Sequence, residues 1–418
     1  MSQKKYFTLA TLGCRTNQYE TQGYRDQLLQ LGCQEATQND LADLIIVNTC
    51  TVTESADSNS RHIIRSLVKK HPGAKVVVTG CLAERRPDLI QKIEGVDLVV
   101  PNQEKEKLMV KLFPNLENLP EFSISHFEAH TRSFVKVQDG CNSFCTYCII
   151  PYVRGRSRSR SITEIISEVN QLVSNGYKEV VITGINVGDF EEKGKRLADL
   201  IRAVDQVKGL KRLRVSSIDP DEVDDDLADA ILNGRVTCPS MHIVLQAGSN
   251  VVLKRMNRKY TRQIFLSTCR RLKKASPDFT FTTDVIVGFP GETMEDFNET
   301  LDVMAQIKFA KVHMFPYSRR DRTRAAVYKN CVSDQEIARR KQILLRLAEQ
   351  QTFALQESYV GRTLSILTES IDENGMIGGH TENFLYVKVP KGNLKINEIV
   401  SVKLKQNTST GLVGEIDE

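Results

Sequence analysis

The segment Phe134-Val-Lys-Val-Gln-Asp-Gly-Cys141-Asn-Ser-Phe-Cys145-Thr-Tyr-Cys148 joins an apolar, strand-like run to a loop with three cysteines. Three and then two residues separate the thiols, and thiolates spaced in this way can hold a [4Fe–4S] cluster, which normally takes four cysteine ligands. Because no fourth cysteine is adjacent, one iron would stay open to bind a small molecule such as S-adenosylmethionine and pass it an electron. A zinc knuckle or unrelated cysteines are the alternatives, but zinc sites usually show a second pair of ligands nearby, and the sequence shows none.

The same segment opens a series of strand-like runs with helix-like sequence between them. The runs are Phe134–Val137, Glu179–Thr183, Leu213–Ser217, His242–Gln246, Thr280–Val287 and Lys311–Pro316. Six βα units in a row predict a partial (β/α)6 barrel, in which active sites lie at the carboxyl ends of the strands. The cysteine loop leaves the first run at that end. A long helix is expected from Ser333 to about Ser358, with Ser333 and Glu336 as a capping box.

The first hundred residues show a second alternation of strands and helices. Strand-like runs at Tyr6–Leu12, Leu44–Val47, Lys75–Thr79 and Leu98–Val100 alternate with helix-like stretches at Gln18–Leu31, Glu54–Lys70 and Glu84–Ile93. This pattern predicts an open parallel α/β sheet.

Three cysteines follow these strands at similar positions, in T-L-G-Cys14, V-N-T-Cys50 and V-T-G-Cys81. The carboxyl ends of parallel strands share one edge of a sheet, where ligands bind, so the three thiols should converge. We expect a second iron–sulfur cluster there. The alternative is three buried small side chains, because cysteine is often buried. The other four cysteines, Cys33, Cys238, Cys269 and Cys331, have no such spacing and are interpreted as core residues.

After Tyr359 the pattern changes to short strand-like runs separated by Gly, Asn and Pro turns. These are Thr363–Thr368, Phe384–Val389, Ile399–Leu404 and Leu412–Ile416, and they predict a small all-β barrel. A linker is expected at Phe113–Glu121, which carries two prolines. The expected domains are therefore residues 4–115, 127–357 and 358–418.

The composition of the chain limits the cellular compartment in which we expect the protein. The chain has 418 residues, a net charge of +5 and 40% hydrophobic residues, and it has no signal-peptide-like start. No stretch reaches the ~18 apolar residues that span a membrane. We expect a cytoplasmic protein without membrane contact. Its ten cysteines are then not a disulfide framework, because that compartment is reducing.

These features resemble the methylthiotransferases of the radical S-adenosylmethionine (SAM) superfamily, from Thr8 to about Ile416, including a C-terminal barrel of the TRAM type. Within that family, three stretches are similar to the branch that acts on threonylcarbamoyladenosine in tRNA: T-L-G-C-R-T-N-Q-Y-E-T (11–21), Q-D-G-C-N-S-F-C-T-Y-C-I-I-P-Y-V-R-G-R-S-R-S-R (138–160) and L-Q-A-G-S-N-V-V-L-K-R-M-N-R-K-Y (245–260). The isopentenyladenosine branch tends to have an acidic pair after R-G, where this chain has R-S-R-S. The chain departs from the family pattern at R-T-R-A (322–325), where G-T-P-A is more usual.

The resemblance implies a mechanism and partners. The cluster on Cys141, Cys145 and Cys148 would bind and reductively cleave SAM, and the resulting 5′-deoxyadenosyl radical would take a hydrogen from carbon 2 of the adenine at tRNA position 37. A second cluster, on Cys14, Cys50 and Cys81, would hold the sulfur to be inserted, and a second SAM would supply the methyl group. The partners implied are the tRNA substrate and an electron-donor protein such as flavodoxin or ferredoxin.

Further candidates lie at the expected barrel mouth. Candidate SAM contacts are Tyr147, Thr183, Gly184, Asn186, Ser216, Ser217, Gln246 and Asp284, for which ordinary packing, turn and strand-end roles are the alternative. Candidate RNA contacts are the basic runs Arg154–Arg160 and Arg319–Arg324 and the C-terminal barrel with Lys388, Lys391, Lys395, Lys403 and Lys405.

Two other functions stay open from the sequence. One is the same reaction on isopentenyladenosine in tRNA. The other is a non-catalytic iron–sulfur protein that binds RNA or acts as a sensor, which would not cleave SAM.

Overall fold

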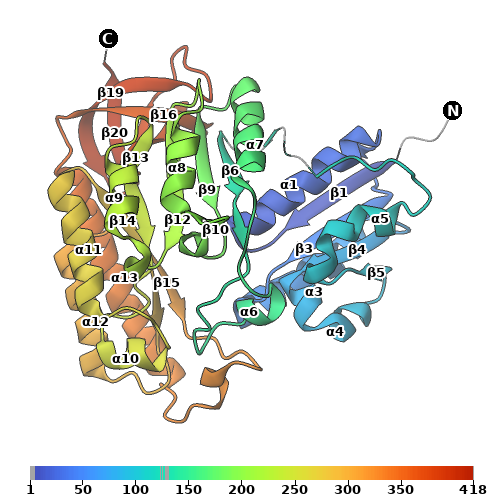
Figure 1. The fold of residues 1–418 in the computed structure, drawn as a ribbon, viewed down its shortest axis with the longest axis horizontal. Coiled ribbons are helices and arrows are strands. Elements are labelled where there is room, and N and C mark those ends of the chain that lie inside the picture. Colours follow the sequence, from blue (N-terminus) through green and yellow to red (C-terminus); the bar gives the residue numbers. More distant parts are fainter. Residues whose placement is uncertain (1–4, 123, 125, 128–130, 418) are drawn as a thin grey trace.

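The computed structural model describes residues 5–122, 124, 126–127 and 131–417. It contains three main bodies of β-structure along the chain, each with its own apolar core (Figure 1). The expected domain ends at residues 4 and 418 lie outside the described residues. None of the described helices is both long and apolar enough to cross a membrane.

The N-terminal sheet has five parallel strands in the order β2-β1-β3-β4-β5. Its strands are β1 (Tyr6–Thr11), β2 (Gln34–Glu35), β3 (Leu44–Thr49), β4 (Lys75–Gly80) and β5 (Leu98–Val99). Its helices are α1 (Arg15–Gln30), α2 (Glu54–Lys70), α3 (Cys81–Arg85), α4 (Pro87–Gln91) and α5 (Leu108–Leu112). The single helix expected at Glu84–Ile93 is two short helices, because Pro87 cannot continue the first and instead begins the second.

The second sheet, called the half-barrel below, has six parallel strands in the order β15-β14-β13-β12-β9-β6, and its two edge strands do not pair with each other. Its strands are β6 (Arg132–Lys136), β9 (Glu179–Thr183), β12 (Arg212–Ile218), β13 (Thr237–Ile243), β14 (Thr280–Val287) and β15 (Lys311–Pro316). The helices that cover its outer face are α7 (Ile162–Ser174), α8 (Leu197–Asp205), α9 (Asp225–Leu232), α11 (Arg262–Ala275), α12 (Met294–Ile307) and α13 (Asp334–Glu357) (Figure 1). Helix α13 begins as expected, because the Ser333 side chain accepts a hydrogen bond from the Glu336 amide.

One strand of the half-barrel differs from the sequence-based expectation. We predicted a strand at His242–Gln246, but β13 runs from Thr237 to Ile243. Beyond it, Gln246 takes a left-handed conformation (φ 60°) and forms only an isolated bridge to Val285. A left-handed residue cannot continue a regular strand, so the strand ends before Gln246.

The N-terminal sheet completes the half-barrel at both of its open edges. Helix α1 packs against the edge strand β6. At the opposite edge, Arg320 follows β15 and its buried guanidinium pairs with Glu54 and Asp57 of α2, at 2.7 Å each. Arg320 was predicted to contact RNA phosphates; this prediction is wrong, because the side chain is enclosed between the two bodies.

The C-terminal barrel is closed and has five strands, one more than the sequence indicated. They are β16 (Thr363–Ile371), β17 (Met376–Thr381), β18 (Tyr386–Pro390), β19 (Ile399–Thr408) and β20 (Gly411–Ile416). It sits against the amino ends of the half-barrel strands, where Arg212 of β12 donates to the carbonyls of His380 and Ser365 at 2.8 Å. Figure 1 shows it at the end of the half-barrel away from α6 (Ile150–Val153) and α10 (Asn250–Arg255).

Candidate metal centres

The strand ends of the N-terminal sheet bring together the N-terminal triad, which we define as Cys14, Cys50 and Cys81. Cys14 follows β1 and caps α1, Cys50 follows β3, and Cys81 follows β4 and starts α3. The strands β1, β3 and β4 are direct neighbours in the sheet. The three thiols therefore follow neighbouring strand ends at one edge of the sheet, as their similar positions after the strands predict.

Two glycines allow this convergence. Gly13 and Gly80 directly precede Cys14 and Cys81, and both have left-handed backbones, with φ of 96° and 93°. A Cβ atom on Gly13 would lie 2.7 Å from the Cβ of Cys50. Only glycine fits both the torsion angle and the space, so the G-C pairs hold the triad compact.

Asn17, one turn into α1, ties two of these strand ends to each other. Its amide donates to the carbonyl of Leu12 at 2.7 Å and to that of Thr49 at 3.1 Å. These carbonyls belong to the segments that lead into Cys14 and Cys50. The asparagine therefore sets the separation of the two cysteine-bearing segments, a role that the sequence did not indicate.

The second set of thiols, the loop triad, consists of Cys141, Cys145 and Cys148 and lies between β6 and the short helix α6 (Ile150–Val153). Thr146 anchors this loop on both sides: its amide donates to the Met256 carbonyl at 2.9 Å, and its carbonyl accepts from the Ala325 amide at 2.8 Å. The loop is therefore held by segments that follow β13 and β15, which come from distant parts of the half-barrel.

Only a thin apolar layer separates the two triads. Cys81 packs with Ile149, Ile150 and Val153 in one buried cluster, and Cys141 and Cys148 pack against the same cluster. Helices α3 and α6 are in direct contact. A group held by one triad would thus lie close to a group held by the other, with one turn of helix between them.

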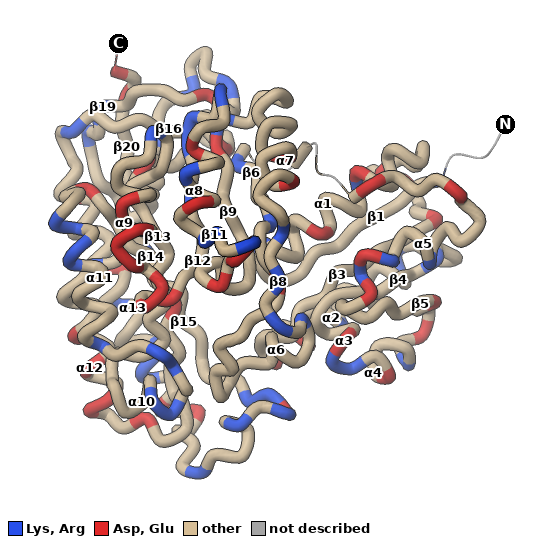
Figure 2. The backbone as a smooth tube through the Cα atoms, viewed as in Figure 1, with Lys and Arg blue, Asp and Glu red and all other residues tan. Residues whose placement is uncertain are grey.

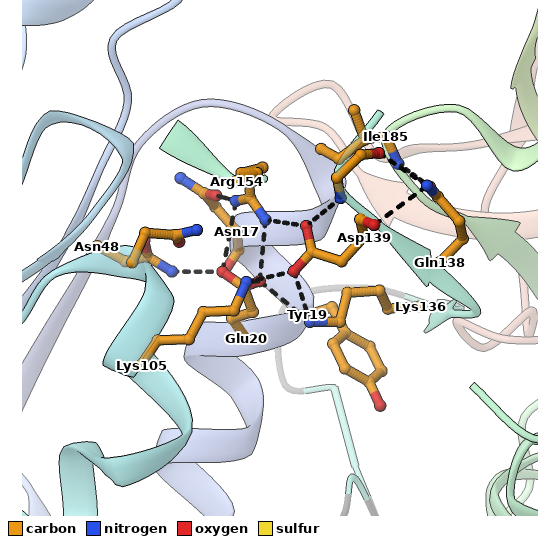
Figure 3. Close-up of polar contacts among 12 residues, drawn as sticks. Asn17, Tyr19, Glu20, Asn48, Lys105, Lys136, Gln138, Asp139, Arg154 and Ile185 are labelled. Carbon is orange, nitrogen blue, oxygen red and sulfur yellow. Dashed lines mark hydrogen bonds and ion pairs between the residues drawn. The ribbon is translucent and has the colours of Figure 1, made fainter. Parts of the chain in front are cut away.

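A buried ion cluster joins the two triads on their polar side (Figure 3). Arg154, at the end of α6, pairs with Glu20 at 3.1 Å and with Asp139 at 2.8 Å, and it also donates to Asn17. Lys105 and Lys136 complete the cluster around the same two carboxylates; Lys136 lies 3.1 Å from Glu20. The prediction that Arg154 follows RNA phosphates is wrong, because its side chain is wholly buried.

Electrostatics at the triads follow from burial. Burial raises the pKa of Cys50 to about 12, and the neighbouring Cys81 thiol adds to this shift. Burial also raises the pKa of Cys81, against which the positive charge of Arg154 acts. Burial alone would lower the pKa of Arg154, but Cys81, Glu20 and Asp139 raise it well above its usual range. Without metal the thiols of Cys50 and Cys81 are therefore protonated, so iron binding must displace their protons.

Arg258 lies beside the loop triad, as Arg154 lies beside the N-terminal triad. Its Nη1 lies 3.0 Å from the Sγ of Cys145, and its other amino group pairs with Asp219. Arg258 stands in the N-R-K-Y end of the stretch used for the resemblance, but the sequence did not assign it a role. The structure shows a guanidinium that donates directly to a sulfur of the loop triad.

The two triads fit sulfur-rich anionic groups better than single ions. In the part of the chain that the structure describes, no three Cys, His, Asp or Glu side chains cluster tightly enough to hold one metal ion. A [4Fe–4S] cluster instead distributes its thiolates over separate irons, which keeps the sulfurs further apart. The Nε–H groups of Arg154 and Arg258 are both buried, and neither has a hydrogen-bond acceptor among the described residues. Each triad therefore has a spare donor beside it for cluster sulfur.

Three of the candidate SAM contacts lie on the loop that leaves β9. Thr183 is its last strand residue, and Gln138 secures the residues that follow: its Oε1 accepts from the amides of Ile185 at 3.0 Å and Asn186 at 3.1 Å. A Cβ atom on Gly184 would lie 2.9 Å from the same oxygen, which explains the glycine. The sequence missed Gln138, although it lies directly before the cysteine loop.

Asn186 in turn contacts a carboxyl group whose pKa is raised. Its side-chain amide donates to Glu222 at 2.8 Å. Burial, followed by the charge of Asp219, raises the pKa of Glu222 to about 7. This places a titrating group at the candidate SAM site that the sequence did not reveal.

The remaining candidates differ in their surroundings. Tyr147 packs edge-on against Phe289, with 6.3 Å between ring centroids. The side-chain oxygens of Ser216 and Gln246 are buried and find no hydrogen-bond partner in the part of the chain that the structure describes, and Ser217 is only half-buried. Asp284 lies within the half-barrel, 3.4 Å from His242. The unpaired oxygens of Ser216 and Gln246 suit a bound polar ligand, whereas Tyr147 has the packing contacts of a core residue.

Comparison with known proteins agrees with these two sites. Residues 135–304 match the radical SAM superfamily, and residues 6–101 match the uncharacterized protein family UPF0004. The chain is 48% identical to the threonylcarbamoyladenosine tRNA methylthiotransferase MtaB of Chlamydia pneumoniae, over 99% of this chain and 98% of that protein. It is 31% identical to the tRNA-2-methylthio-N(6)-dimethylallyladenosine synthase of Acetivibrio thermocellus, over 99% and 91%.

Among solved structures, the radical SAM methyltransferase TsrM of Kitasatospora setae superposes with a TM-score of 0.58. The match covers 78% of this chain and 74% of that one at 14% identity, so it speaks for the fold alone. The similarity to methylthiotransferases reaches 48% identity over nearly the whole chain. Both cysteine triads lie within the ranges that match the two family models. The chain belongs to the methylthiotransferase family of the radical SAM superfamily.

Proposed function

We propose that the protein adds a methylthio group to carbon 2 of threonylcarbamoyladenosine at position 37 of tRNA, using SAM and two [4Fe–4S] clusters. The observation that carries this proposal is the 48% identity over the whole chain to a threonylcarbamoyladenosine tRNA methylthiotransferase. The dimethylallyladenosine enzyme that we compared is 31% identical, which favours the first substrate. The position of two cysteine triads across one turn of helix agrees with a reaction that needs two neighbouring clusters.

The proposed cofactors fit the residues present. Cys141, Cys145 and Cys148 would hold the cluster that binds SAM, and Cys14, Cys50 and Cys81 the second. When bound, these groups supply reductive cleavage of SAM and the sulfur for transfer. Arg258 donates to the Cys145 sulfur and so orients the loop triad.

The half-barrel provides the chamber for the reaction. The N-terminal sheet covers its open side through α1 and through the Arg320–Asp57 pair. Thr183, Gly184, Asn186, Ser216 and Gln246 would bind SAM at the carboxyl ends of the strands.

For tRNA, we infer an approach to the end of the half-barrel that carries α6 and α10. Figure 2 shows basic residues at this end, on the loop after β15 and around α10. Arg156 and Arg158, in the segment that follows α6, are also exposed. The adenine must leave its stack to reach the triads. The C-terminal barrel would bind a more distant part of the RNA through lysines such as Lys395 and Lys403, which are exposed.

Two finer points complete the proposal. We infer that a small electron-transfer protein of the flavodoxin or ferredoxin type delivers the electron to the loop triad's cluster. We also infer that the three bodies are domains with boundaries near residues 115–127 and 357–358.

Mass spectrometry of nucleosides tests the function directly. Anaerobically reconstituted enzyme, SAM and a reductant are incubated with tRNA that carries threonylcarbamoyladenosine or isopentenyladenosine at position 37. We expect the methylthio product from the first tRNA, and none with the C141A variant. Product from the isopentenyladenosine tRNA alone would overturn the substrate assignment, and no product from either tRNA, with SAM cleaved or not, would overturn the proposed reaction.

A further inference from the structure

Arg15 is a cation inside the half-barrel that has no partner. It is the first residue of α1, directly after Cys14, and its guanidinium lies 5.5 Å from the ring centroid of Phe134 on β6. Among the residues that the structure describes, its side chain makes no hydrogen bond and no ion pair, and it is only partly exposed. Keeping an unpaired charge in a largely buried place costs free energy, so a functional explanation for Arg15 is needed.

The neighbours of Arg15 do not neutralise it. Two cationic groups around it already have carboxylate partners: Arg214 pairs with Glu179 at 2.6 Å and Arg132 with Glu369 at 3.4 Å. Arg132 and Arg214 repel Arg15. Of the two carboxylates that attract it, Glu179 is engaged by Arg214, and Asp284 forms no ion pair with Arg15. The Arg15 guanidinium therefore lacks a direct anionic partner among the described residues, and an anionic ligand group would provide one.

The substrate named under the proposed function carries such a group. Threonine attached through its amino group to a carbamoyl on adenine keeps a free carboxylate, whereas an isopentenyl group is uncharged. A guanidinium recognises a carboxylate with two parallel hydrogen bonds. A base whose carbon 2 faces the triads would carry its N6 substituent into the same chamber.

We propose that Arg15 binds the carboxylate of the threonylcarbamoyl group and thereby selects this nucleoside over uncharged ones. This inference rests on the proposed function. Arg15 is then a specificity-determining residue: it contacts the substrate outside the reacting carbon and is not required for cleavage of SAM. Its place directly after Cys14 fixes the distance between the recognised carboxylate and the N-terminal triad.

The test compares tRNA affinities of the reconstituted enzyme for the same tRNA with and without the threonylcarbamoyl group. We expect the wild-type protein to bind the modified tRNA more tightly, and Arg15→Gln to lose that preference by roughly ten- to hundredfold, the range for one charged hydrogen-bonded contact. Affinity for the unmodified tRNA should not change. Arg15→Lys should keep part of the preference, because it keeps the charge without the two-pronged geometry.

Arg25→Gln is the matched control, since Arg25 lies on the same helix and pairs with Glu35 far from the chamber. SAM cleavage without tRNA is the second measurement, and it should be unchanged in Arg15→Gln. An unchanged preference for modified tRNA in Arg15→Gln would overturn the inference, and so would a loss of SAM cleavage, which would assign Arg15 to the SAM carboxylate. Failure of the wild-type enzyme to modify this tRNA would instead refute the proposed function.

Discussion

Arg154 and Glu20 form an ion pair across the boundary between the N-terminal sheet and the half-barrel, with 3.1 Å between Nη1 and Oε1. Arg154 follows the loop triad by six residues and Glu20 follows Cys14 by six. The pair therefore links the two metal-binding segments directly. Because both side chains are buried, each depends on the other for its charge to be tolerated there.

The first prediction concerns this pair. Arg154→Gln should lower the free energy of unfolding of the metal-free protein by about 3 kcal/mol, because it leaves Glu20 and Asp139 with less compensating charge in a buried place. Urea unfolding measures the loss. Arg158→Gln, in the same segment but exposed, should change stability by less than about 0.5 kcal/mol. Equal stabilities of the two variants would show that the pair does not hold the bodies together.

Iron content distinguishes the two triads. The reconstituted protein should hold about eight irons, and the triple variant C141A/C145A/C148A about four, those of the remaining cluster. Iron and sulfide analysis with absorption spectra gives both values. The variant C238A/C269A is the control, because these buried cysteines lie outside both triads and should leave the iron content unchanged. Full iron content in the triple variant would exclude the loop triad as a ligand set.

The triads should also separate by role. Replacement of Cys14, Cys50 and Cys81 by Ala should abolish methylthiolation but leave reductive cleavage of SAM, since we propose that the SAM site belongs to the loop triad. The measurement is 5′-deoxyadenosine formed per enzyme in the absence of tRNA. If a folded variant, checked by circular dichroism, no longer cleaves SAM, the proposed division between the triads is incorrect.

Glu222 predicts a dependence of stability on pH. Its pKa in the folded protein, about 7, lies above the ordinary glutamate value, so the folded state keeps a proton that the unfolded chain has lost. The contribution of Glu222 to stability is therefore full at low pH and declines as the pH rises from about 4.5 to about 7. Compared with Glu222→Gln, the wild-type metal-free protein should lose stability between pH 5 and 7 and then remain level. Parallel curves for the two proteins would contradict the raised pKa.

Surface lysines test the RNA role of the C-terminal barrel without removing it. Truncation is a poor test, because Arg212 and Arg214 of the half-barrel donate hydrogen bonds to main-chain carbonyls of this barrel. Removal of the barrel would leave these buried guanidinium groups without those acceptors. Lys395→Ala and Lys403→Ala should each weaken tRNA binding and reduce the salt slope by roughly one, if each lysine contacts a phosphate. Lys70→Ala, at the end of α2, is the control. Unchanged slopes would indicate that the barrel acts only as a cap on the half-barrel.

Much of this architecture is encoded locally and could be predicted. The alternation of strands and helices gave two parallel sheets, and the repeated cysteine after β1, β3 and β4 placed three thiols at one edge. Strand β17 was missed because its sequence, M-I-G-G-H-T, has two glycines where side chains would normally signal a strand. A Cβ atom on Gly379 would lie 1.9 Å from the Leu367 carbonyl oxygen, so the glycine reflects close contact between strands.

Long-range charge pairing could not be predicted from the same patterns. Arg154 and Arg320 stand in basic runs that resemble phosphate-binding surfaces, yet both are buried. Their partners, Glu20 and Asp57, are more than a hundred residues away in the sequence, and nothing in the local pattern links them. The unpaired Arg15 was equally hidden, because the absence of a partner is visible only when the whole interior is known.

The contact of the N-terminal sheet with both edges of the half-barrel has a consequence for protein engineering. The N-terminal sheet and the half-barrel cannot be exchanged between relatives independently of each other. A chimera that takes residues 5–113 from a relative must also bring acidic groups that meet Arg154 at one seam and Arg320 at the other. Hybrids that keep the ion pairs of both Arg154 and Arg320 should assemble. Hybrids that keep only one of these pairs should leave the half-barrel uncovered along the other edge.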